Sequence, residues 1–404
     1  MLATLEQGIE GGKWFRLFDN VISERNLFAA FQQVASNRGS AGVDHITVSD
    51  FERALPESLW EVADQLKHGG YRPQSIRRVH IPKPGTNETR PLGIPTVRDR
   101  MVQAAVVNVI EPIFERDFAD QSYGFRPGRG CKDALCRVDE LIQAGHVYVV
   151  DADLKGYFDT IPHDRLLSRL KEKIADGSVL SLIETFLKAK ILDGPEELTP
   201  SMGAPQGAVL SPLLSNIYLD PLDHMMAQTG LEMVRYAGDF VILCQTAEEA
   251  AHALALVEAW VTENELQLHP TKTKVVDVRT EGFDFLGYHF RGWRYRPRKQ
   301  SVTKLKTKIR HKTPRTNGNS LPAIIADLNR MLRGWFEYFQ HGRLRLYSRL
   351  DGWIRRRLRR ILMSRNKLRG QALGKANARW PDAYFDERGL YSLARAYSSP
   401  ANPL

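Results

Sequence analysis

The chain has few cysteines and no long apolar run. Cys131, Cys136 and Cys244 are odd in number and contain no CxxC pair, which argues against a disulfide framework or a cysteine zinc site. No apolar run reaches the ~20 residues that a transmembrane helix needs. Residues 1–13 contain acids and lack a continuous apolar region, so no signal peptide is evident. We therefore expect a soluble, cytoplasmic protein with no membrane partner.

Acidic residues are scarce in one long segment. Residues 291–379 contain 26 Lys and Arg but only three acids, although the whole chain has a net charge of only +10. A solvated charged face would explain such a block in general. Here, however, the bases alternate with aromatic residues, namely Trp293, Trp335, Tyr338, Tyr347 and Trp353. Cations bind phosphates and aromatic rings stack on unpaired bases, so the segment favours a nucleic-acid partner.

The length of 404 residues predicts roughly two to four folded units. Apolar residues recur at helical spacing in several segments, which are 26–36, 48–67, 98–118, 132–144, 163–188, 210–228, 247–265, 321–339 and 347–364. Strands are expected at 147–150, 274–278 and 283–290, and in two hairpins. One hairpin covers 71–95 with a Pro- and Gly-containing loop at 84–88, and the other covers 231–244. Residues from 370 onward are weakly patterned.

Carboxylates follow two of the expected strands. Asp151 and Asp153 come directly after the apolar strand 147–150, and Asp239 lies at the turn of the 231–244 hairpin. Hard divalent cations prefer carboxylate oxygens, and phosphoryl transfer uses two such cations about 3.5–4 Å apart. We expect Asp153, the backbone carbonyl of Leu154 and Asp239 to hold metal, with Asp153 and Asp239 as the catalytic residues. Asp151 shares a face with Asp153, and the sequence leaves open whether it also holds metal.

Two further acids near these strands have a simpler interpretation. Asp159 and Asp164 are expected to be helix caps or structural acids.

The order of motifs resembles that of group II intron-encoded reverse transcriptases and maturases over about residues 26–392. The matching segments are 39–44 (GSAGVD), 81–85 (IPKPG), 90–95 (RPLGIP), 122–128 (SYGFRPG), 151–163, 205–212, the 236–239 turn, 285–288 (FLGY) and 332–335 (LRGW). The resemblance implies an α+β right-hand polymerase. Its expected parts are an N-terminal extension (1–25), fingers with part of the palm (26–135), a palm with an antiparallel sheet backed by helices (136–290), a basic helical thumb or maturase domain (291–370) and a tail (371–404).

The resemblance also implies roles in nucleotide binding. Lys83 and Arg90 would clamp the triphosphate of a dNTP from a fingers hairpin. Phe158 would exclude a 2′-hydroxyl, and Gln206 would pack against the incoming nucleotide. Without the motifs, the two bases would read as ordinary surface residues and Phe158 as a core aromatic.

Nucleic-acid contacts are implied in the same way. Arg126 lies in an element of the template-side surface, and Leu286 and Gly287 lie in a hairpin that grips the primer. Basic and aromatic residues of the thumb would bind RNA, among them Arg333, Trp335, Arg355 and Arg356. The implied partners are intron RNA and an RNA template with a DNA primer, and the implied cofactor is Mg²⁺, with Mn²⁺ as a substitute. No endonuclease domain is expected, because no histidine and paired-cysteine segment follows.

The turn at 236–239 departs from the family pattern. The family has Tyr-Ala-Asp-Asp, and the first of those aspartates is a metal ligand, whereas this chain has Gly238 at that position. Loss of such a ligand costs several powers of ten in rate, about 1.4 kcal/mol for each factor of ten. Since side chains alternate along a strand, we expect Asp239 to point away from Asp153 unless the glycine lets the turn rearrange.

Three functions stay open at this point. The chain is a maturase that assists splicing and has lost most polymerase activity, a slow polymerase that uses Asp153, Asp239 and Asp151, or a homologue that only binds structured RNA.

Overall fold

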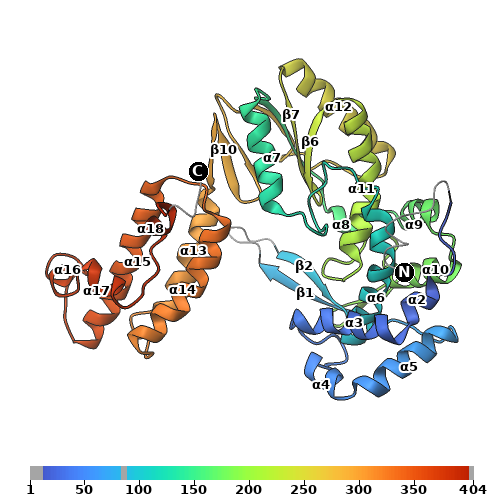
Figure 1. Cartoon of the computed structure of the whole chain (residues 1–404), viewed down its shortest axis with the longest axis horizontal. Coiled ribbons are helices and arrows are strands. Elements are labelled where there is room, and N and C mark those ends of the chain that lie inside the picture. Colours follow the sequence, from blue (N-terminus) through green and yellow to red (C-terminus); the bar gives the residue numbers. More distant parts are fainter. Residues whose placement is uncertain (1–11, 83–88, 400–404) are drawn as a thin grey trace. The chain divides into compact units, whose positions relative to one another are not determined.

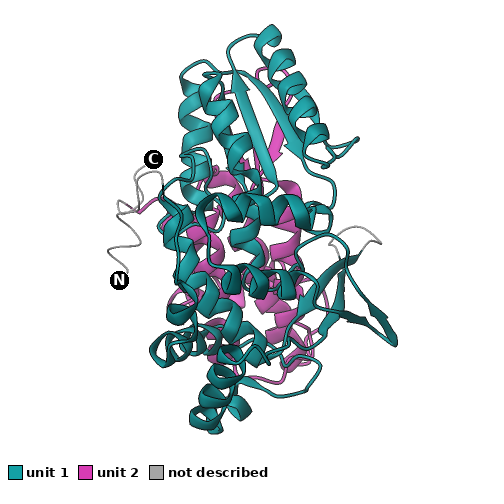
Figure 2. Ribbon diagram, turned by 90° about the vertical axis from the view of Figure 1, so that its right-hand side faces the viewer, with its two compact units in different colours: residues 1–276 teal, residues 277–404 magenta. Residues whose placement is uncertain are grey.

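The computed structural model describes residues 12–82 and 89–399, and the chain divides into two compact units, residues 1–276 and 277–404 (Figure 2). The sequence analysis predicted the boundary between palm and thumb 14 residues further along the chain, between residues 290 and 291. In the structure the three-stranded sheet at 283–297 therefore belongs to the same unit as the basic helices. The finer division into fingers, palm and thumb stays a prediction. None of the described helices is long and apolar enough to cross a membrane.

The first unit begins with helices that pack around one long buried helix (Figure 1). These helices are α2 (Phe18–Ile22), α3 (Glu24–Ser36), α4 (Val48–Arg53), α5 (Leu55–Lys67) and the central α6 (Val97–Glu115). The sequence pattern predicted a single helix over 48–67. The structure corrects this, because the helix breaks at Ala54 and restarts with Pro56 in the first turn of α5. Proline suits a first turn, where its missing N–H has no partner to lose.

Strands β1 (Ile76–Pro82) and β2 (Thr89–Ile94) form the expected hairpin between α5 and α6. The other edge of β1 pairs in parallel with β4 (Ile191–Asp193), which in turn pairs with β5 (Glu196–Leu198). The last two strands were not predicted. Three-residue strands are too short for an alternating pattern to be recognised.

A second sheet in this unit carries the candidate catalytic acids. Its strand order is β6-β7-β3-β8, formed by β6 (Glu232–Tyr236), β7 (Asp239–Cys244), β3 (Tyr148–Asp153) and β8 (Lys274–Asp277). Helices back it, as expected. α7 (Cys131–Gln143) packs on β6 and β7, and α12 (Ala247–Glu263) packs on β3 and β7 (Figure 1). The remaining helices are α8 (Tyr157–Thr160), α9 (His163–Lys173), α10 (Gly177–Leu187) and α11 (Ser211–Gln228).

The second unit joins a small antiparallel sheet to a helical bundle. The sheet has the order β11-β10-β9, with β9 (Phe283–Phe285), β10 (Tyr288–Arg291) and β11 (Arg294–Pro297). Three long helices follow, α13 (Lys299–Lys312), α14 (Leu321–Tyr338) and α15 (Leu344–Arg365). Their apolar faces share one buried core. The α+β class with a C-terminal helical domain is thus confirmed.

The segment beyond residue 370 folds into short helices despite its weak pattern. They are α16 (Lys375–Arg379), α17 (Asp382–Asp386) and α18 (Leu393–Tyr397). The buried carboxylate of Asp351 in α15 accepts hydrogen bonds from the backbone N–H groups of Leu393 and Ala394 at 3.0 Å and from the Ser392 hydroxyl at 2.7 Å. One buried acid in a basic helix therefore fixes the start of α18.

Candidate nucleotide and metal site

The two candidate catalytic acids face each other across neighbouring strands. β3 and β7 are antiparallel, and Asp153 pairs in register with Asp239. Directly opposed residues of an antiparallel pair have their side chains on the same face, with Cβ atoms about 4.5–5.5 Å apart. The expectation that Asp239 points away from Asp153 was therefore wrong. The register of β7 against β3 decides on which face of the sheet the Asp239 side chain lies. Asp151, two residues before Asp153, lies on the same face.

A lysine that the sequence did not suggest contacts the first acid. The ammonium of Lys272 lies 2.5 Å from Oδ2 of Asp153, and the backbone N–H of His269 donates to the Asp153 carbonyl at 2.7 Å. Lys272 belongs to a polar loop before β8, where nothing in the local pattern marks it out. Its ammonium is a positive group held where the carboxylate is also expected to bind metal.

The turn that joins β6 and β7 consists of two residues, Ala237 and Gly238, because Tyr236 pairs directly with Asp239. Ala237 has a φ of 57°, whereas Gly238 does not have a positive φ. The backbone at Gly238 therefore accepts an ordinary side chain. A Cβ added there would lie 3.0 Å from Cδ1 of Tyr157, a buried ring whose hydroxyl donates to the Ser215 carbonyl at 2.6 Å. A side chain at position 238 fits only if that ring shifts by a few tenths of an ångström.

A fully buried ion pair supports this turn. The guanidinium of Arg235 in β6 contacts the carboxylate of Asp223 in α11 at 2.5 Å, and both side chains are 0% exposed. The same guanidinium donates to the Ala237 carbonyl at 3.0 Å and to the Ser122 hydroxyl at 2.7 Å. Removing one partner of such a pair leaves an uncompensated buried charge, which costs about 3–5 kcal/mol. Arg235 therefore positions the turn, and sequence reasoning missed it.

The segment 122–128 packs directly on the same turn. The backbone N–H of Tyr123 donates to the Arg235 carbonyl at 2.9 Å, and the Asn216 amide donates to the Gly124 carbonyl at 2.8 Å. A Cβ at Gly124 would lie 2.5 Å from the Ala237 nitrogen. Only glycine allows this approach, which explains why this position carries it.

Arg126 does not lie on a nucleic-acid surface. Its side chain is 3% exposed, pairs with Glu115 at 2.9 Å, and donates to the carbonyls of Ala119 at 2.6 Å and Ser122 at 2.9 Å. A guanidinium enclosed in this way cannot reach a phosphate. The structure thus corrects the predicted nucleic-acid contact, and Arg126 holds the segment that supports the turn.

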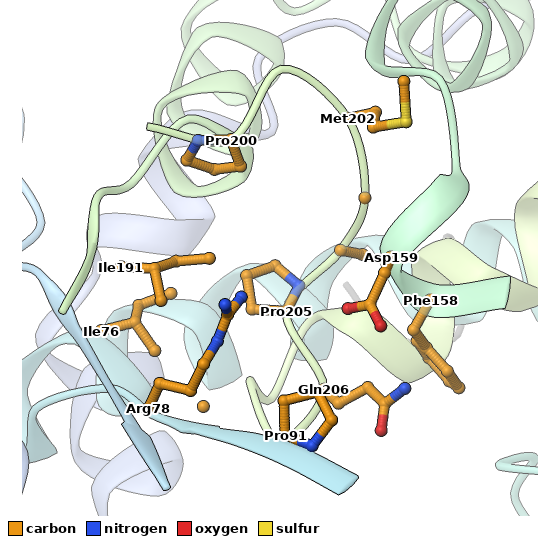
Figure 3. A pocket seen from close by; sticks show the side chains of 13 residues that line it. Ile76, Arg78, Pro91, Phe158, Asp159, Ile191, Pro200, Met202, Pro205 and Gln206 are labelled. Atoms are coloured by element: carbon orange, nitrogen blue, oxygen red, sulfur yellow. The ribbon is translucent and has the colours of Figure 1, made fainter. Parts of the chain in front are cut away.

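A cavity of about 260 Å³ lies between the β1–β2 hairpin and the loop at 200–206 (Figure 3). Its lining includes Phe158, Gln206, Arg78 and Asp159, whose side chains are drawn around the opening in Figure 3. Two of these, Phe158 and Gln206, were predicted to contact the nucleotide. Arg78 was not predicted, and Asp159 was interpreted as a cap or structural acid.

Gln206, which was predicted to pack against the incoming nucleotide, joins the β1–β2 hairpin to the loop at 200–206. The Oε1 of Gln206 accepts from Nε of Arg90 at 2.7 Å, and the Gln206 carbonyl accepts from the Gly93 N–H at 2.6 Å. Gly207 has a φ of 102°, and a Cβ there would lie 2.4 Å from the Gly93 carbonyl oxygen. The structure therefore brings Arg90 to Gln206, which lines this cavity. Lys83 lies outside the described residues.

The aromatic residues near the turn stay neutral. Burial raises the pKa of Tyr157 well above its usual value. Burial also raises the pKa of Tyr236 to about 12, and a hydrogen bond with Cys131 adds to that shift. Rings from three segments gather here, since Phe125 lies 6.5 Å from Phe158 and 6.0 Å from Tyr236 between ring centres. Carboxylates are thus the anionic groups on which metal binding depends.

The donors present fit a divalent cation held by few ligands. The carboxylates of Asp153 and Asp239 lie on one face, next to the backbone of Leu154, and the Lys272 ammonium shows that this face attracts a cation. Across the described residues, no group of three or more His, Cys, Asp or Glu side chains is arranged to hold a metal ion. The family pattern has an aspartate at the position of Gly238, where a Cβ would lie against the ring of Tyr157.

The predicted nucleic-acid residues of the second unit fall into two groups. Arg355 is enclosed, since its side chain is 11% exposed and pairs with Asp386 at 2.9 Å. Arg356 and Arg333 are exposed, and Arg333 also lies 4.8 Å over the ring of Tyr391. The fourth, Trp335, stacks on Phe339 at 5.0 Å. Arg355 and Arg356 are thus neighbours in α15, one enclosed and the other exposed.

The two residues predicted to grip a primer lie at a tight turn. Leu286 has a φ of 46° and Gly287 a φ of 84°. The carbonyl of Leu286 accepts from the Tyr338 hydroxyl at 2.8 Å, which ties the turn to α14.

Comparison with known proteins covers both units. Residues 81–290 match the family of reverse transcriptases (RNA-dependent DNA polymerases), and residues 302–380 match the group II intron maturase-specific domain. The group II intron-encoded protein LtrA of Lactococcus lactis is 37% identical over 222 residues, which are 54% of this chain and 36% of LtrA. Protein YkfC of Escherichia coli is 32% identical over 314 residues, 68% of this chain and 82% of YkfC. The chain thus spans about a third of LtrA and most of YkfC.

One solved structure shows a weaker likeness. A chain of a partial Cas6-RT-Cas1–Cas2 complex is 25% identical, with a TM-score of 0.40, and the match covers 61% of this chain and 41% of that chain.

Proposed function

The chain belongs to the group II intron reverse transcriptase and maturase family, and from that premise we propose that it binds intron RNA and assists splicing, with impaired RNA-directed DNA polymerase activity. One observation carries the proposal. On the nucleotide side, Phe158 and Gln206 line one cavity and Arg90 donates to Gln206, whereas the metal side has Gly238 in place of a carboxylate. The residues that would contact the nucleotide are present, whereas one carboxylate that the chemical step would use is absent.

The nucleotide side supports recognition of a dNTP. Arg90 is exposed and forked, which suits a triphosphate, and its bond to Gln206 orients it toward the loop that lines the cavity. Phe158 occupies the wall of that cavity, where a ring would discriminate against a 2′-hydroxyl by its bulk. These residues bind and orient a nucleotide without any carboxylate.

The metal side supports a weakened reaction. Polymerases of this family use divalent metal ions, and we assign Mg²⁺, or Mn²⁺ as a substitute, to Asp153, Asp239 and the carbonyl of Leu154. When bound, such an ion lowers the pKa of an attacking hydroxyl and stabilises charge on the phosphates. The chain's own residues keep the two carboxylates on one face, and Lys272 holds Asp153 in place. One anionic ligand fewer means weaker binding of the cation.

The second unit supports the RNA-binding part of the proposal. Its exposed cations include Lys304, Lys308, Arg310, Arg333 and Arg356. Trp353 lies under three cations, since Lys306, Arg310 and Arg357 are all within 6 Å of its ring centre, the longest distance being 5.9 Å. Structured RNA with unpaired bases offers phosphates and base faces to such a surface. We propose intron RNA and an RNA template with a DNA primer as its partners.

Two rates measured on one preparation test the proposal. The native chain should accelerate splicing of the intron precursor RNA that surrounds its coding sequence, and Asp153→Ala should accelerate it equally, because the metal side takes no part in RNA binding. Primer extension on an RNA template should be slow for the native chain and absent for Asp153→Ala. Failure of both proteins to accelerate splicing would overturn the maturase assignment.

A second function is a non-catalytic protein that only binds structured RNA. The contact between Lys272 and Asp153 favours it, because an ammonium already neutralises the acid on which a metal depends. Tight RNA binding with neither extension nor splicing would identify this function.

A further inference from the structure

The second unit contains a cavity that the proposed function leaves without a role. It measures about 460 Å³ and lies between the turn at Gly287, the first turns of α13 and the C-terminal half of α14. Its lining includes apolar side chains, namely Leu305, Met331 and the ring of Phe339. Protein sites for small organic ligands have volumes of about 300–1,000 Å³. The cavity is therefore large enough for a nucleotide.

Hydrogen bonds fix the walls of this cavity. The Gly287 carbonyl accepts from the Arg298 N–H at 3.0 Å and from the Ser301 hydroxyl at 2.9 Å. On the opposite wall the Tyr288 hydroxyl donates to the Tyr338 carbonyl at 2.6 Å. Hydrogen bonds between the turn and the two helices thus hold the walls of the cavity in place.

Gly334 leaves open space in the wall of the cavity. It lies inside α14, where glycine is less favourable than alanine by about 0.8–1.0 kcal/mol. Glycine is needed where φ is positive or where another chain segment comes close, but Gly334 has no positive φ and a Cβ added to it would meet no atom within 4 Å. It does line the cavity. A larger side chain there would occupy this space, so the glycine leaves the cavity open.

Cations surround the opening. Arg298, Lys304 and Lys308 line the cavity together with the ring of Trp335. Lys304 and Lys308 are exposed and four residues apart on α13, so they extend from one face of the helix. A ligand that matches this lining has a flat apolar part for the apolar side chains and an anionic part for the rim.

Two donors in the lining lack acceptors. The indole N–H of Trp335 and the Nε–H of Arg298 are buried and make no hydrogen bond within the described part of the chain. Buried donors without partners are rare because each one costs free energy. A ligand with acceptor atoms would satisfy them after a small rotation of either side chain.

We propose that this cavity receives one unpaired nucleotide of bound RNA, with its base over Trp335 and Phe339 and its phosphate between Arg298 and the two lysines. The inference rests on the proposed function, since it names the feature of RNA that the second unit selects. Fully paired RNA presents phosphates but no free base face, so it would bind the surrounding cations and leave the cavity empty.

Two RNA hairpins that differ by a single bulged adenosine test the proposal. Binding of the full chain is followed by fluorescence anisotropy at one fixed salt concentration. We expect the native chain to bind the bulged hairpin about tenfold more tightly than the paired one, within the range measured for one base stacked on an aromatic side chain. Gly334→Leu fills the cavity and should remove this preference while leaving affinity for the paired hairpin unchanged.

Gly352→Leu is the matched control. Gly352 also lies inside a long helix of this unit, a Cβ there also meets nothing within 4 Å, and it does not line the cavity. It should keep the tenfold preference, and both variants should melt at or above the native temperature, because each replaces a helical glycine.

The outcomes separate the two proposals. Tight binding of both hairpins by the native chain with no preference, or a preference that survives Gly334→Leu, would overturn the nucleotide site and leave RNA binding standing. Failure to bind either hairpin would overturn the proposed function itself.

Discussion

Two buried arginines of the first unit and two exposed arginines of the second unit differ in what they can contact. In the first unit, Arg126 and Arg235 are 3% and 0% exposed and are enclosed by Glu115, Asp223 and backbone carbonyls. In the second unit, Arg333 and Arg356 are exposed. An enclosed guanidinium organises the backbone around it, whereas an exposed one can bind a phosphate. Arg126 and Arg235 therefore position the turn of the first unit, whereas we propose that Arg333 and Arg356 bind RNA.

The largest effect should come from the buried pair under the turn. Arg235→Leu leaves Asp223 charged and buried without its partner, so the free energy of unfolding should fall by about 3–5 kcal/mol. Urea denaturation followed by circular dichroism measures it. A loss below about 1 kcal/mol would show that the enclosed arginine is not needed to hold the turn.

Arg355 and Arg356 offer a sharper comparison, because they are adjacent in one helix. Arg355→Gln breaks a contact with Asp386 and should lower the free energy of unfolding by about 1.5–3 kcal/mol, the range for hydrogen bonds to charged groups. Its effect on RNA affinity should be small. Loss of RNA affinity without loss of stability would place Arg355 in the recognition group instead.

Arg356→Gln should show the reverse behaviour. Stability should change by no more than about 0.5 kcal/mol, as for most surface substitutions. RNA affinity should weaken, and the slope of log K against log salt should decrease by about 1, because one phosphate contact is lost. Anisotropy titrations at several salt concentrations give the slope. An unchanged slope would exclude Arg356 from the phosphate-binding surface.

The smallest expected effect concerns an acid that pairs with cations in the first unit. Hydrogen bonding by Arg116, together with Lys173, lowers the pKa of Asp117 to about 2. The folded pKa is below the unfolded value of about 3.9, so the pair stabilises the fold above that pH and the stabilisation is lost as pH falls toward 2. Asp117→Asn should be less stable than the native chain at pH 6 and should approach it near pH 2.

The sequence predicted elements with strong periodicity better than contacts between them. Helices α6, α11, α12, α14 and α15 follow from spacing alone, and the antiparallel pairing of the strands bearing Asp153 and Asp239 follows from the hairpin and the resemblance. The side of the sheet on which the Asp239 side chain lies did not follow from the sequence. It depends on register across two strands, and counting along one strand cannot supply it.

Residues that act through distant partners were also missed. Arg235 meets Asp223 and Ser122, and Lys272 meets a carboxylate 119 positions away. Arg126 was assigned to a surface because its motif resembles a template-side element of the family, yet Glu115 and two carbonyls enclose it. Burial of a polar side chain is decided by tertiary packing, which local composition does not encode.

The most direct test of the central claim is single-turnover primer extension on an RNA template with Mg²⁺, comparing the native chain with Gly238→Asp and Gly238→Ala. The alanine variant makes the same contact with Tyr157 without adding a carboxylate. Gly238→Asp should extend at least about a hundredfold faster than the native chain, which corresponds to about 2.7 kcal/mol. Gly238→Ala should stay at the native rate, and all three should bind RNA equally. A correctly folded Gly238→Asp that extends no faster than the native chain would contradict the claim that the missing carboxylate limits polymerisation.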